Sequence, residues 1–190
     1  MAGWAGNGEG YTAYFSTIMT FPNSFSSPRL IFERLRPDHA DLIHAMHQDA
    51  VQMALLGGVR TLEQTAAYLK RNLDHWAEFN FGIWLLRDAT TNEVIGRTLL
   101  RHLMLDGVDE VETGYGFSPA VWGRGLATEA TLTCVDYGWR VLGLKSIVAV
   151  TRPINGASRR VMEKAGMTFD REILHDGIPH VVYRVAAPAP

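Results

Sequence analysis

The sequence predicts one α/β domain in which a mostly antiparallel sheet is flanked by helices. Four segments repeat apolar residues at helical spacing, and seven shorter segments have the composition and boundaries of strands. An Asp-Gly pair separates two of the longest strand segments, which is typical of an antiparallel hairpin. The chain has 190 residues and shows no internal repeat and no second core, so we expect a single domain.

The two ends of the chain differ from the middle. Residues 1–27 are rich in Gly, Ser, Thr and aromatic residues, with Glu9 as the one charged residue, and show no lasting periodicity. We interpret them as an N-terminal extension of uncertain order. Residues 28–185 are predicted to form the domain. Residues 186–190 are predicted to be a short tail, because two prolines disfavour helix and central strand.

A short strand and two helices open the predicted domain. Residues 30–35 form the strand, which ends before Pro37. The predicted buried stripe of the first helix is Leu42, Ile43, Met46 and Ala50. The second helix begins at Thr61, because Thr61 and Gln64 have the spacing of a capping box. Its predicted buried stripe is Leu62, Ala66, Leu69, Leu73 and Trp76.

Three strands then form a predicted meander over residues 82–86, 94–105 and 108–117. Their connections are the polar residues 88–92 and the Asp106-Gly107 pair. Asp-Gly pairs favour two-residue hairpin turns, so we expect the second and third of these strands to be antiparallel neighbours.

Two helices and three strands complete the predicted domain. The third helix covers about residues 125–141, ends near Gly143, and is predicted to bury Ala127, Ala130, Cys134 and Tyr137. The wholly apolar residues 147–150 indicate a strand covered on both faces. Asn155 opens the fourth helix, which ends at Gly166 and is predicted to bury Val161, Met162 and Ala165. Residues 167–174 and 180–185 are the final strands, around an Asp176-Gly177 turn.

The overall charge argues against a dedicated nucleic-acid or membrane-surface binder. The chain has 18 Lys and Arg, 20 Asp and Glu, and a net charge of −2. Nucleic-acid and membrane-surface binders draw affinity from excess basic charge, so we expect neither kind of partner. One cysteine, Cys134, excludes an intrachain disulfide, and neither a signal peptide nor a membrane-spanning run is visible. We therefore expect a cytoplasmic protein.

The loop before the third helix has the composition of an anion-binding site. Gly123 and Gly125 stand between a strand and a helix start, which offers unpaired N–H groups and partial positive charge. A P-loop is excluded because no Gly-Lys-Ser/Thr follows, and a dinucleotide fingerprint because Thr128 replaces its third glycine. Residues 124–164 also carry seven Lys and Arg against three Asp and Glu, which suits a phosphate-bearing ligand. A tight turn with solvated basic residues stays an open alternative.

Four motifs together resemble the acyl-CoA-binding signature of the GNAT N-acetyltransferase superfamily, in its RimJ/RimL-like branch. They are ETGY at residues 112–115, WGRGLATEA at 122–130, NGAS at 155–158 and EKAG at 163–166. The resemblance covers about residues 28–185 in element order. It implies the acyl-CoA N-acyltransferase fold, with a mixed, mostly antiparallel sheet, and an N-acetyltransferase activity.

The resemblance implies acetyl-CoA as co-substrate and no metal. Its pyrophosphate would rest on backbone N–H groups, and its pantetheine arm would lie along the backbone near Phe117, in a splayed gap between two central strands. Asn155 would bond the arm, and Ser158 would lie near the thioester sulfur. The implied cofactor-binding residues are Phe117, Trp122, Gly123, Arg124, Gly125, Leu126, Ala127, Thr128, Asn155 and Ser158.

The reaction needs a proton acceptor, stabilisation of negative charge on the thioester oxygen, and a position for the amine. Glu112 is the candidate general base, directly or through water; a strand carboxylate paired with an arginine is the alternative. The position at which many members of the superfamily carry an acidic tyrosine is Met162 here, so Ser158 becomes the candidate acid. Ser158 is equally compatible with a helix-capping role. Backbone N–H groups near Phe117 are the candidate oxyanion donors.

The expected partner is a primary amine, either a protein N-terminus or a small molecule, bound near residues 54–60 and 176–180. A homodimer is possible. His44 and His47 lack a third ligand, so no metal site is expected. His180 and Tyr183 are interpreted mainly as packing residues. The alternative functions are a non-catalytic acyl-CoA-binding module and a plain globular domain, which binding and thiol-release assays would separate.

Overall fold

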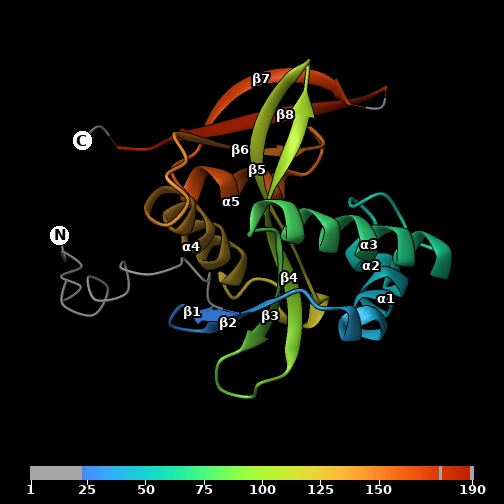
Figure 1. Cartoon of the computed structure of the whole chain (residues 1–190). Coiled ribbons are helices and arrows are strands. Elements are labelled where there is room, and N and C mark those ends of the chain that lie inside the picture. The colour runs from blue at the N-terminus through green and yellow to red at the C-terminus, as the bar shows by residue number, and fades with distance from the viewer. Residues whose placement is uncertain (1–22, 176, 189–190) are drawn as a thin grey trace, which may run out of the picture.

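The computed structural model of this chain describes residues 23–175 and 177–188. It contains an eight-stranded sheet with the order β1-β2-β3-β4-β5-β6-β8-β7 (Figure 1). The pair β5–β6 is parallel and every other neighbouring pair is antiparallel. The strands are β1 (Ser24–Ser26), β2 (Leu30–Arg34), β3 (Ile83–Asp88), β4 (Val94–Leu105), β5 (Val108–Phe117), β6 (Ser146–Thr151), β7 (Thr168–His175) and β8 (Ile178–Ala186).

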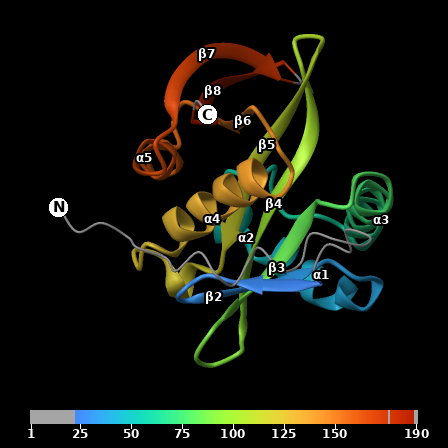
Figure 2. The same cartoon turned by 60° about the vertical axis from the view of Figure 1, so that its left-hand side comes forward.

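The helices lie in two groups on opposite faces of the sheet. In Figures 1 and 2, α1, α2 and α3 lie on one side of β4 and β5, and α4 and α5 lie on the other. The α-helices are α1 (Ala40–Gln48), α2 (Ala50–Met53), α3 (Leu62–Phe79), α4 (Leu126–Arg140) and α5 (Gly156–Lys164). Short 3₁₀ turns occupy Pro37–His39 and Pro119–Val121. No helix in the described part of the chain is long and apolar enough to cross a membrane.

The central hairpin has the predicted bounds. β4 and β5 pair from Gly96↔Phe117 to Leu105↔Val108. Asp106 and Gly107 join them with φ values of 51° and 80°, the left-handed conformation that a tight hairpin turn requires. The two predicted helix caps are also confirmed: Thr61 and Gln64 form a capping box at α3, and Asn155 accepts the amide of Ser158 at α5.

The predicted stripe of the first helix is partly wrong. The Asp49 side chain accepts hydrogen bonds from the amides of Val51 and Gln52, at 2.9 Å each, and thereby caps a separate helix, α2. Ala50 therefore lies beyond the end of α1. Leu42 is exposed and Met46 is half-buried, while Ile43 and the polar His47 are the buried residues of α1.

The predicted stripe of α3 is shifted around the helix. Leu62 is 63% exposed and Ala66 is exposed, whereas Leu69 and Trp76 are buried as predicted. The true buried face includes three residues that apolar periodicity does not register, because they are polar or amphipathic: Thr65, Tyr68 and Asn72. Thr65 bonds His47 on α1 at 3.0 Å, so a polar contact sets the rotation of the helix.

The sheet also begins earlier than predicted. Ser24–Ser26 form β1 at the edge of the sheet, within the segment interpreted as an N-terminal extension. Its one apolar residue, Phe25, stacks between Phe32 and Tyr137, with ring centroids 4.6 and 4.9 Å away. A three-residue strand is too short to show alternation, which is why the pattern missed it. Residues 1–22 lie outside the described residues.

The main core lies between the β2–β5 part of the sheet and the helices. Trp76 of α3 and Trp84 of β3 meet edge to face with centroids 5.3 Å apart, and the Trp76 indole donates to the Ile83 carbonyl at 2.8 Å. Cys134 of α4 is buried in this core as predicted, while the predicted Ala127 is half-buried and Leu126 takes its place. A smaller cluster packs α5 against β6 and β8 and includes Met162, Met167 and Tyr183.

Candidate active site

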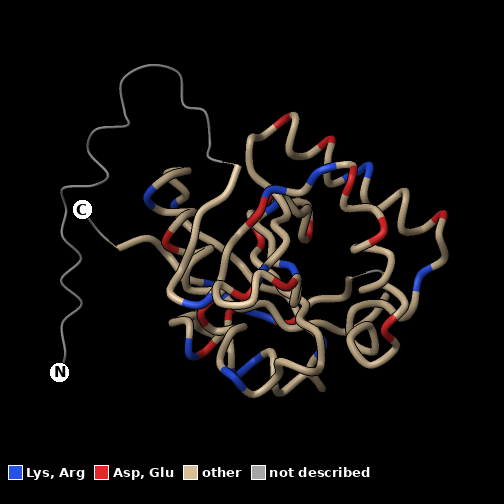
Figure 3. Tube along the Cα trace, turned by 90° about the horizontal axis from the view of Figure 1, so that it is seen from below, with Lys and Arg blue, Asp and Glu red and all other residues tan. Residues whose placement is uncertain are grey.

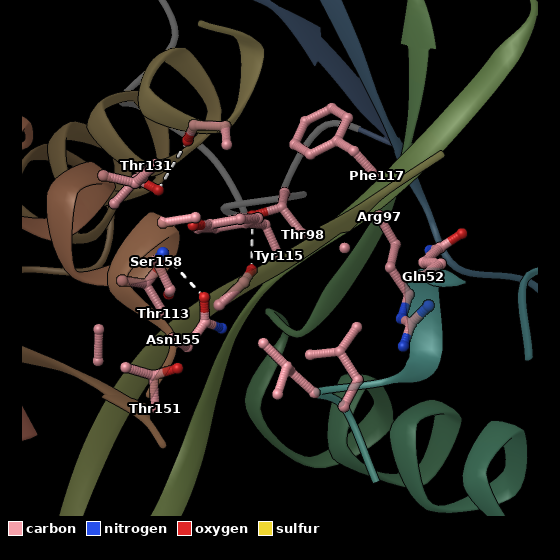
Figure 4. A pocket seen from close by; sticks show the side chains of 18 of the residues that line it. Gln52, Arg97, Thr98, Thr113, Tyr115, Phe117, Thr131, Thr151, Asn155 and Ser158 are labelled. Carbon is pink, nitrogen blue, oxygen red and sulfur yellow. Dashed lines mark hydrogen bonds between the residues drawn. The ribbon is translucent and has the colours of Figure 1, made fainter. Parts of the chain in front are cut away.

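A cleft of about 1100 Å³ opens where β5 and β6 diverge. These two strands share one residue pair, Glu112↔Val148, whereas β4 and β5 pair over ten residues. From Thr113 onward β5 therefore has no strand partner on its β6 side. Figure 4 shows Asn155 and Ser158 on one side of the cleft, Arg97 and Gln52 on the other, and Tyr115 between them. The predicted gap beside Phe117 is present.

The register of β4 and β5 determines which backbone groups face this gap. The Ser118 amide donates to the Ile95 carbonyl at 2.9 Å, so this pair and every second pair along the hairpin are hydrogen-bonded. The residues between them, Tyr115 and Phe117, direct their N–H and C=O groups away from β4. The Phe117 carbonyl accepts a bond from the indole of Trp122 at 2.9 Å. The N–H groups of Tyr115 and Phe117 remain as donors toward the gap.

The loop that joins β5 to α4 presents a run of backbone donors. Within the described residues, the N–H groups of residues 123–128 have no acceptor in the chain, while the Trp122 amide bonds the Pro119 carbonyl. Gly123 and Gly125 adopt φ values of 77° and 76°, which only glycine takes readily. No side chain caps the α4 N-terminus. Free amides and the helix dipole together favour an anion at this point.

Three basic side chains of the predicted cluster line the same cleft: Arg152, Arg160 and Lys164. The other members lie elsewhere. Arg124 pairs with Asp88 at 3.6 Å and does not line the cleft, although it was among the predicted cofactor-binding residues. Arg140 pairs with Asp136 on the surface of α4. Figure 3 shows basic and acidic residues interspersed along the described trace, as the small net charge implies.

The N-terminus of α5 brings two predicted residues to the cleft. The Asn155 carboxamide oxygen accepts the Ser158 amide at 3.1 Å, which leaves its NH₂ group as a donor. Tyr115 of β5 lies beside Ser158 (Figure 4). Burial raises the pKa of Tyr115, and a hydrogen bond with the Ser158 side chain opposes this effect only in part. Tyr115 is thus a neutral hydroxyl at neutral pH, a group that the sequence analysis did not single out.

Glu112 lies on the opposite face of β5. The residue is 7% exposed and lines the cleft, and its carboxylate accepts a hydrogen bond from the Arg101 guanidinium at 2.5 Å. Burial would lower the pKa of Arg101, but the Glu112 charge and hydrogen bond raise it. Glu112 is therefore paired with an arginine, which was the alternative to its role as a general base. The same carboxylate also lies in the cleft.

The remaining predicted site residues that line the cleft are Phe117, Trp122, Gly123, Gly125, Leu126, Ala127, Thr128, Asn155 and Ser158. Of the residues interpreted as packing, Tyr183 is buried and donates to Glu163 at 3.1 Å, whereas His180 does line the cleft. Burial raises the pKa of the Cys134 thiol to about 12, as befits a core residue. The described residues contain no group of three or more His, Cys, Asp or Glu arranged for a metal ion.

Sequence reasoning found one member of a second set of cleft residues, on the face covered by α1–α3, because Arg60 lies in the predicted acceptor segment 54–60. The members that it missed are Gln52, Tyr68, Arg71, Arg97 and Arg101. They come from three separate segments of the chain, so no local motif could have identified them.

Comparisons with known proteins agree with this geometry. A family model described as Acetyltransferase (GNAT) domain matches residues 29–168. The uncharacterized N-acetyltransferase YoaA of Bacillus subtilis (strain 168) is 28% identical over 170 residues, which span 84% of this chain and 94% of that protein.

Solved structures share the fold. An acetyltransferase from Agrobacterium tumefaciens str. C58 superposes with a TM-score of 0.77 and 24% identity, over 90% of this chain and 98% of that one. RimL, a ribosomal L7/L12 α-N-protein acetyltransferase in complex with coenzyme A, superposes with a TM-score of 0.70 and 16% identity, over 84% and 95%. The sheet order, the cleft and the family match lead to one conclusion: the chain belongs to the GNAT acetyltransferase family.

Proposed function

We propose that this protein transfers the acetyl group of acetyl-CoA to a primary amine, of a protein N-terminus or a small molecule, by direct attack of the amine on the thioester. The GNAT family uses acetyl-CoA, and the RimL structure holds coenzyme A. Acetyl-CoA supplies an acyl carbon already activated as a thioester.

The pyrophosphate site would be the loop before α4. The N–H groups of residues 123–128 lack acceptors in the described chain, and the α4 N-terminus adds partial positive charge. The Thr128 hydroxyl and the Arg152, Arg160 and Lys164 side chains line the same cleft and would add donors and charge. Arg124 would contribute through its backbone N–H alone, because its side chain pairs with Asp88.

The pantetheine arm would lie along the free edge of β5. Tyr115 and Phe117 turn N–H groups toward the gap, where they can pair with amide groups as a neighbouring strand would. Across the gap, the Asn155 NH₂ group is available because its oxygen caps α5. Trp122 holds the loop closed over this edge through its bond to the Phe117 carbonyl.

Negative charge that develops on the thioester oxygen would be stabilised by the same N–H groups near Phe117. The departing sulfur needs modest help, since a thiol has a pKa of about 8.5. Ser158 would pass its hydroxyl proton to the sulfur and regain a proton from solvent water, so that CoA leaves as the thiol and the serine is restored. Tyr115 stays protonated because burial raises its pKa, so its hydroxyl can supply a hydrogen bond to Ser158.

Glu112 would receive the proton of the amine, directly or through water, from the opposite face of β5. Arg101 holds the carboxylate in place. A carboxylate is a weak base, which suits an acceptor that is partly neutral already, as an α-amine with a pKa of about 7.7–8.0 is. It suits a lysine-like amine, with a pKa of about 10.4, less well.

One observation carries the proposal: within the described chain, residues 123–128 form a run of free amides beside an unpaired strand edge, and all of these residues except Arg124 line the cleft. The test is calorimetric titration of CoA into the protein, followed by CoA thiol release from acetyl-CoA with a panel of amines. Tight CoA binding with thiol release from an amine supports the enzyme. Binding without release from any amine would favour a non-catalytic acyl-CoA module, and absence of CoA binding would refute both.

A further inference from the structure

Three arginines surround one tyrosine on the acceptor face of the cleft. The guanidinium carbons of Arg60, Arg97 and Arg71 lie 4.8, 5.6 and 5.9 Å from the ring centroid of Tyr68. Arg97 also donates through Nε to the Tyr68 hydroxyl at 3.1 Å. All four side chains line the cleft. Three like charges are thus held close together beside an open volume.

These charges lack a counter-ion in the described chain. No described carboxylate lies within 4.0 Å of Arg60, Arg71 or Arg97. The acidic residue among the described lining residues, Glu112, bonds Arg101 instead. Arg97 is only 6% exposed, and burial of an unpaired charge is costly. Burial and, more weakly, the charges of Arg97, Arg71 and Arg101 lower the pKa of Arg60, while Tyr68 opposes this.

A buried amide adds a second donor to the same place. Gln52 of α2 is 7% exposed, and its Nε2 atom has no hydrogen-bond partner among the described residues. A Cβ atom built on Gly116 would lie 3.3 Å from Gln52 Nε2 and 3.6 Å from Arg97 Nη1. Leu56 Cδ1 would lie 3.2 Å from the same position, so both donors lie over the Gly116 backbone beside Leu56. Figure 4 shows the Gln52 and Arg97 side chains next to each other.

This donor pair lies close to the reacting position. Gly116 is the residue between Tyr115 and Phe117, whose N–H groups face the gap. Arg97 is paired across the hairpin with Gly116, and Glu112 with Arg101, so the donors and the carboxylate share one face of the hairpin. A small molecule whose anionic group binds Arg97 and Gln52 would thus place an amine at the gap if a few covalent bonds separate the two groups.

We propose that the acceptor is a small amino carboxylate, whose carboxylate binds Arg97 and Gln52 while its amine faces the thioester. The inference rests on the proposed acetyl transfer and adds the class of acceptor. Arginine binds carboxylates through two parallel hydrogen bonds, and Arg60 and Arg71 add attraction at longer range. The same charges repel polyamines, so spermidine is a poor acceptor. A protein N-terminus has a neutral peptide carbonyl at the position of the carboxylate. It would therefore leave the charge of Arg97 without a counter-ion.

The test compares amines with and without this charge. Because the carboxylate also raises the pKa of the neighbouring amine, each rate is expressed per concentration of neutral amine. CoA thiol release is measured with several amino acids, each beside its carboxamide, and with spermidine and short peptides. We expect kcat/KM for each amino acid to exceed that for its carboxamide by about 10- to 100-fold, the effect of hydrogen bonds to a charged group. Equal rates for acid and amide, or a preference for spermidine or peptides, would overturn the inference and leave acetyl transfer standing.

Two variants assign the effect to the two donors. Arg97→Met should raise KM for the amino acid about 10- to 100-fold with little change in kcat, and should abolish the preference over the carboxamide. Gln52→Glu places a carboxylate beside Arg97, is nearly isosteric, and should do the same. The matched control is Arg34→Met, because Arg34 lies 4.5 Å over the Trp76 ring but outside the cleft. Unchanged preference in both cleft variants would refute the assignment.

A binding measurement tests the anion site even if none of the amines is acetylated. Calorimetry with CoA present would compare an N-acetylamino acid with its carboxamide. Tighter binding of the N-acetylamino acid than of its carboxamide, with the difference lost in Gln52→Glu, supports the anion site even if acetyl transfer fails. No preference in either assay rejects it.

Discussion

Gly123 offers a sharp test of the pyrophosphate site, because a second glycine provides a matched control. Gly123 and Gly143 have φ values of 77° and 67°, and a Cβ on either would meet no protein atom within 4 Å. They differ in position: Gly123 begins the run of free amides in the cleft, whereas Gly143 follows the end of α4 and does not line the cleft. Exchange for alanine thus imposes similar strain at both.

The expected stability effect is the same for both variants. A left-handed residue with a Cβ costs about 1–2 kcal/mol, and the reduced freedom of the unfolded chain returns about 0.4–1 kcal/mol. Each variant should therefore lose about 1 kcal/mol of unfolding free energy, or ~2–4 °C in Tm.

The expected effect on CoA differs. Only Gly123→Ala places a methyl group where the pyrophosphate would approach the backbone. Loss of one hydrogen bond to a charged group, about 1.5–3 kcal/mol, corresponds to roughly 10- to 150-fold weaker binding. Gly143→Ala should bind CoA as the wild type does.

Thermal unfolding without ligand would verify that the two variants are equally stable, and isothermal titration would give the Kd for CoA. If Gly123→Ala and Gly143→Ala bind CoA with the same Kd, the amides of residues 123–128 do not hold the pyrophosphate, and the placement of the cofactor is wrong.

Three further perturbations test other parts of the structure. Glu112→Gln should lower kcat about 10²- to 10⁴-fold, the usual contribution of a general base, with CoA affinity by calorimetry as the control. An unchanged kcat would remove Glu112 from the mechanism. Burial, then the charges of Arg97 and Arg60, lower the pKa of His47 from 6.5 to about 3. The unfolded chain therefore binds more protons than the folded chain below pH 6.5, and stability that is present at neutral pH is lost as the pH falls. Urea unfolding should show that the free energy of unfolding decreases by about 2 kcal/mol between pH 7 and pH 5. His47→Gln should diminish this loss, and His44→Gln should leave it unchanged. Thr61→Ala breaks the capping box of α3 and should cost about 0.5–2 kcal/mol in urea unfolding, while Thr133→Ala, a mid-helix exchange on α4, is the comparison.

The sequence predicted those parts of the fold that local patterns determine. The central hairpin has its predicted bounds because the alternation in β4 and β5 and the Asp106-Gly107 turn act within a few residues of each other. The helix starts at Thr61 and Asn155 follow from side chains that bond the backbone three residues on. The loop at Gly123 and Gly125 was also identifiable from neighbouring residues alone, because both glycines stand between a strand and a helix start.

The buried faces of the first helices were predicted less well, because polar contacts between distant segments decide them. His47 is buried since it meets Thr65, 18 residues away, and Asp49 interrupts the helix through its own side chain. The acceptor face was predicted only in part, at residues 54–60 and at His180, for a related reason. Arg60 and Arg97 belong to separate segments and meet only when β4 packs against α3 around Tyr68.

The single pair Glu112↔Val148 makes the molecule two lobes with a narrow backbone connection. One lobe holds most of the large core, around β1–β5, and the other holds most of the small clusters around β6, β7, β8 and α5; Ile147 of β6 packs in the large core and Leu105 of β4 in a small cluster. In the proposed complex, a ligand that spans the gap would add hydrogen bonds to both lobes at once. Amide hydrogen exchange in β6 and β8 should therefore be slower in the complex with CoA than in the free protein, so that the smaller lobe owes part of its rigidity to a molecule that is not polypeptide.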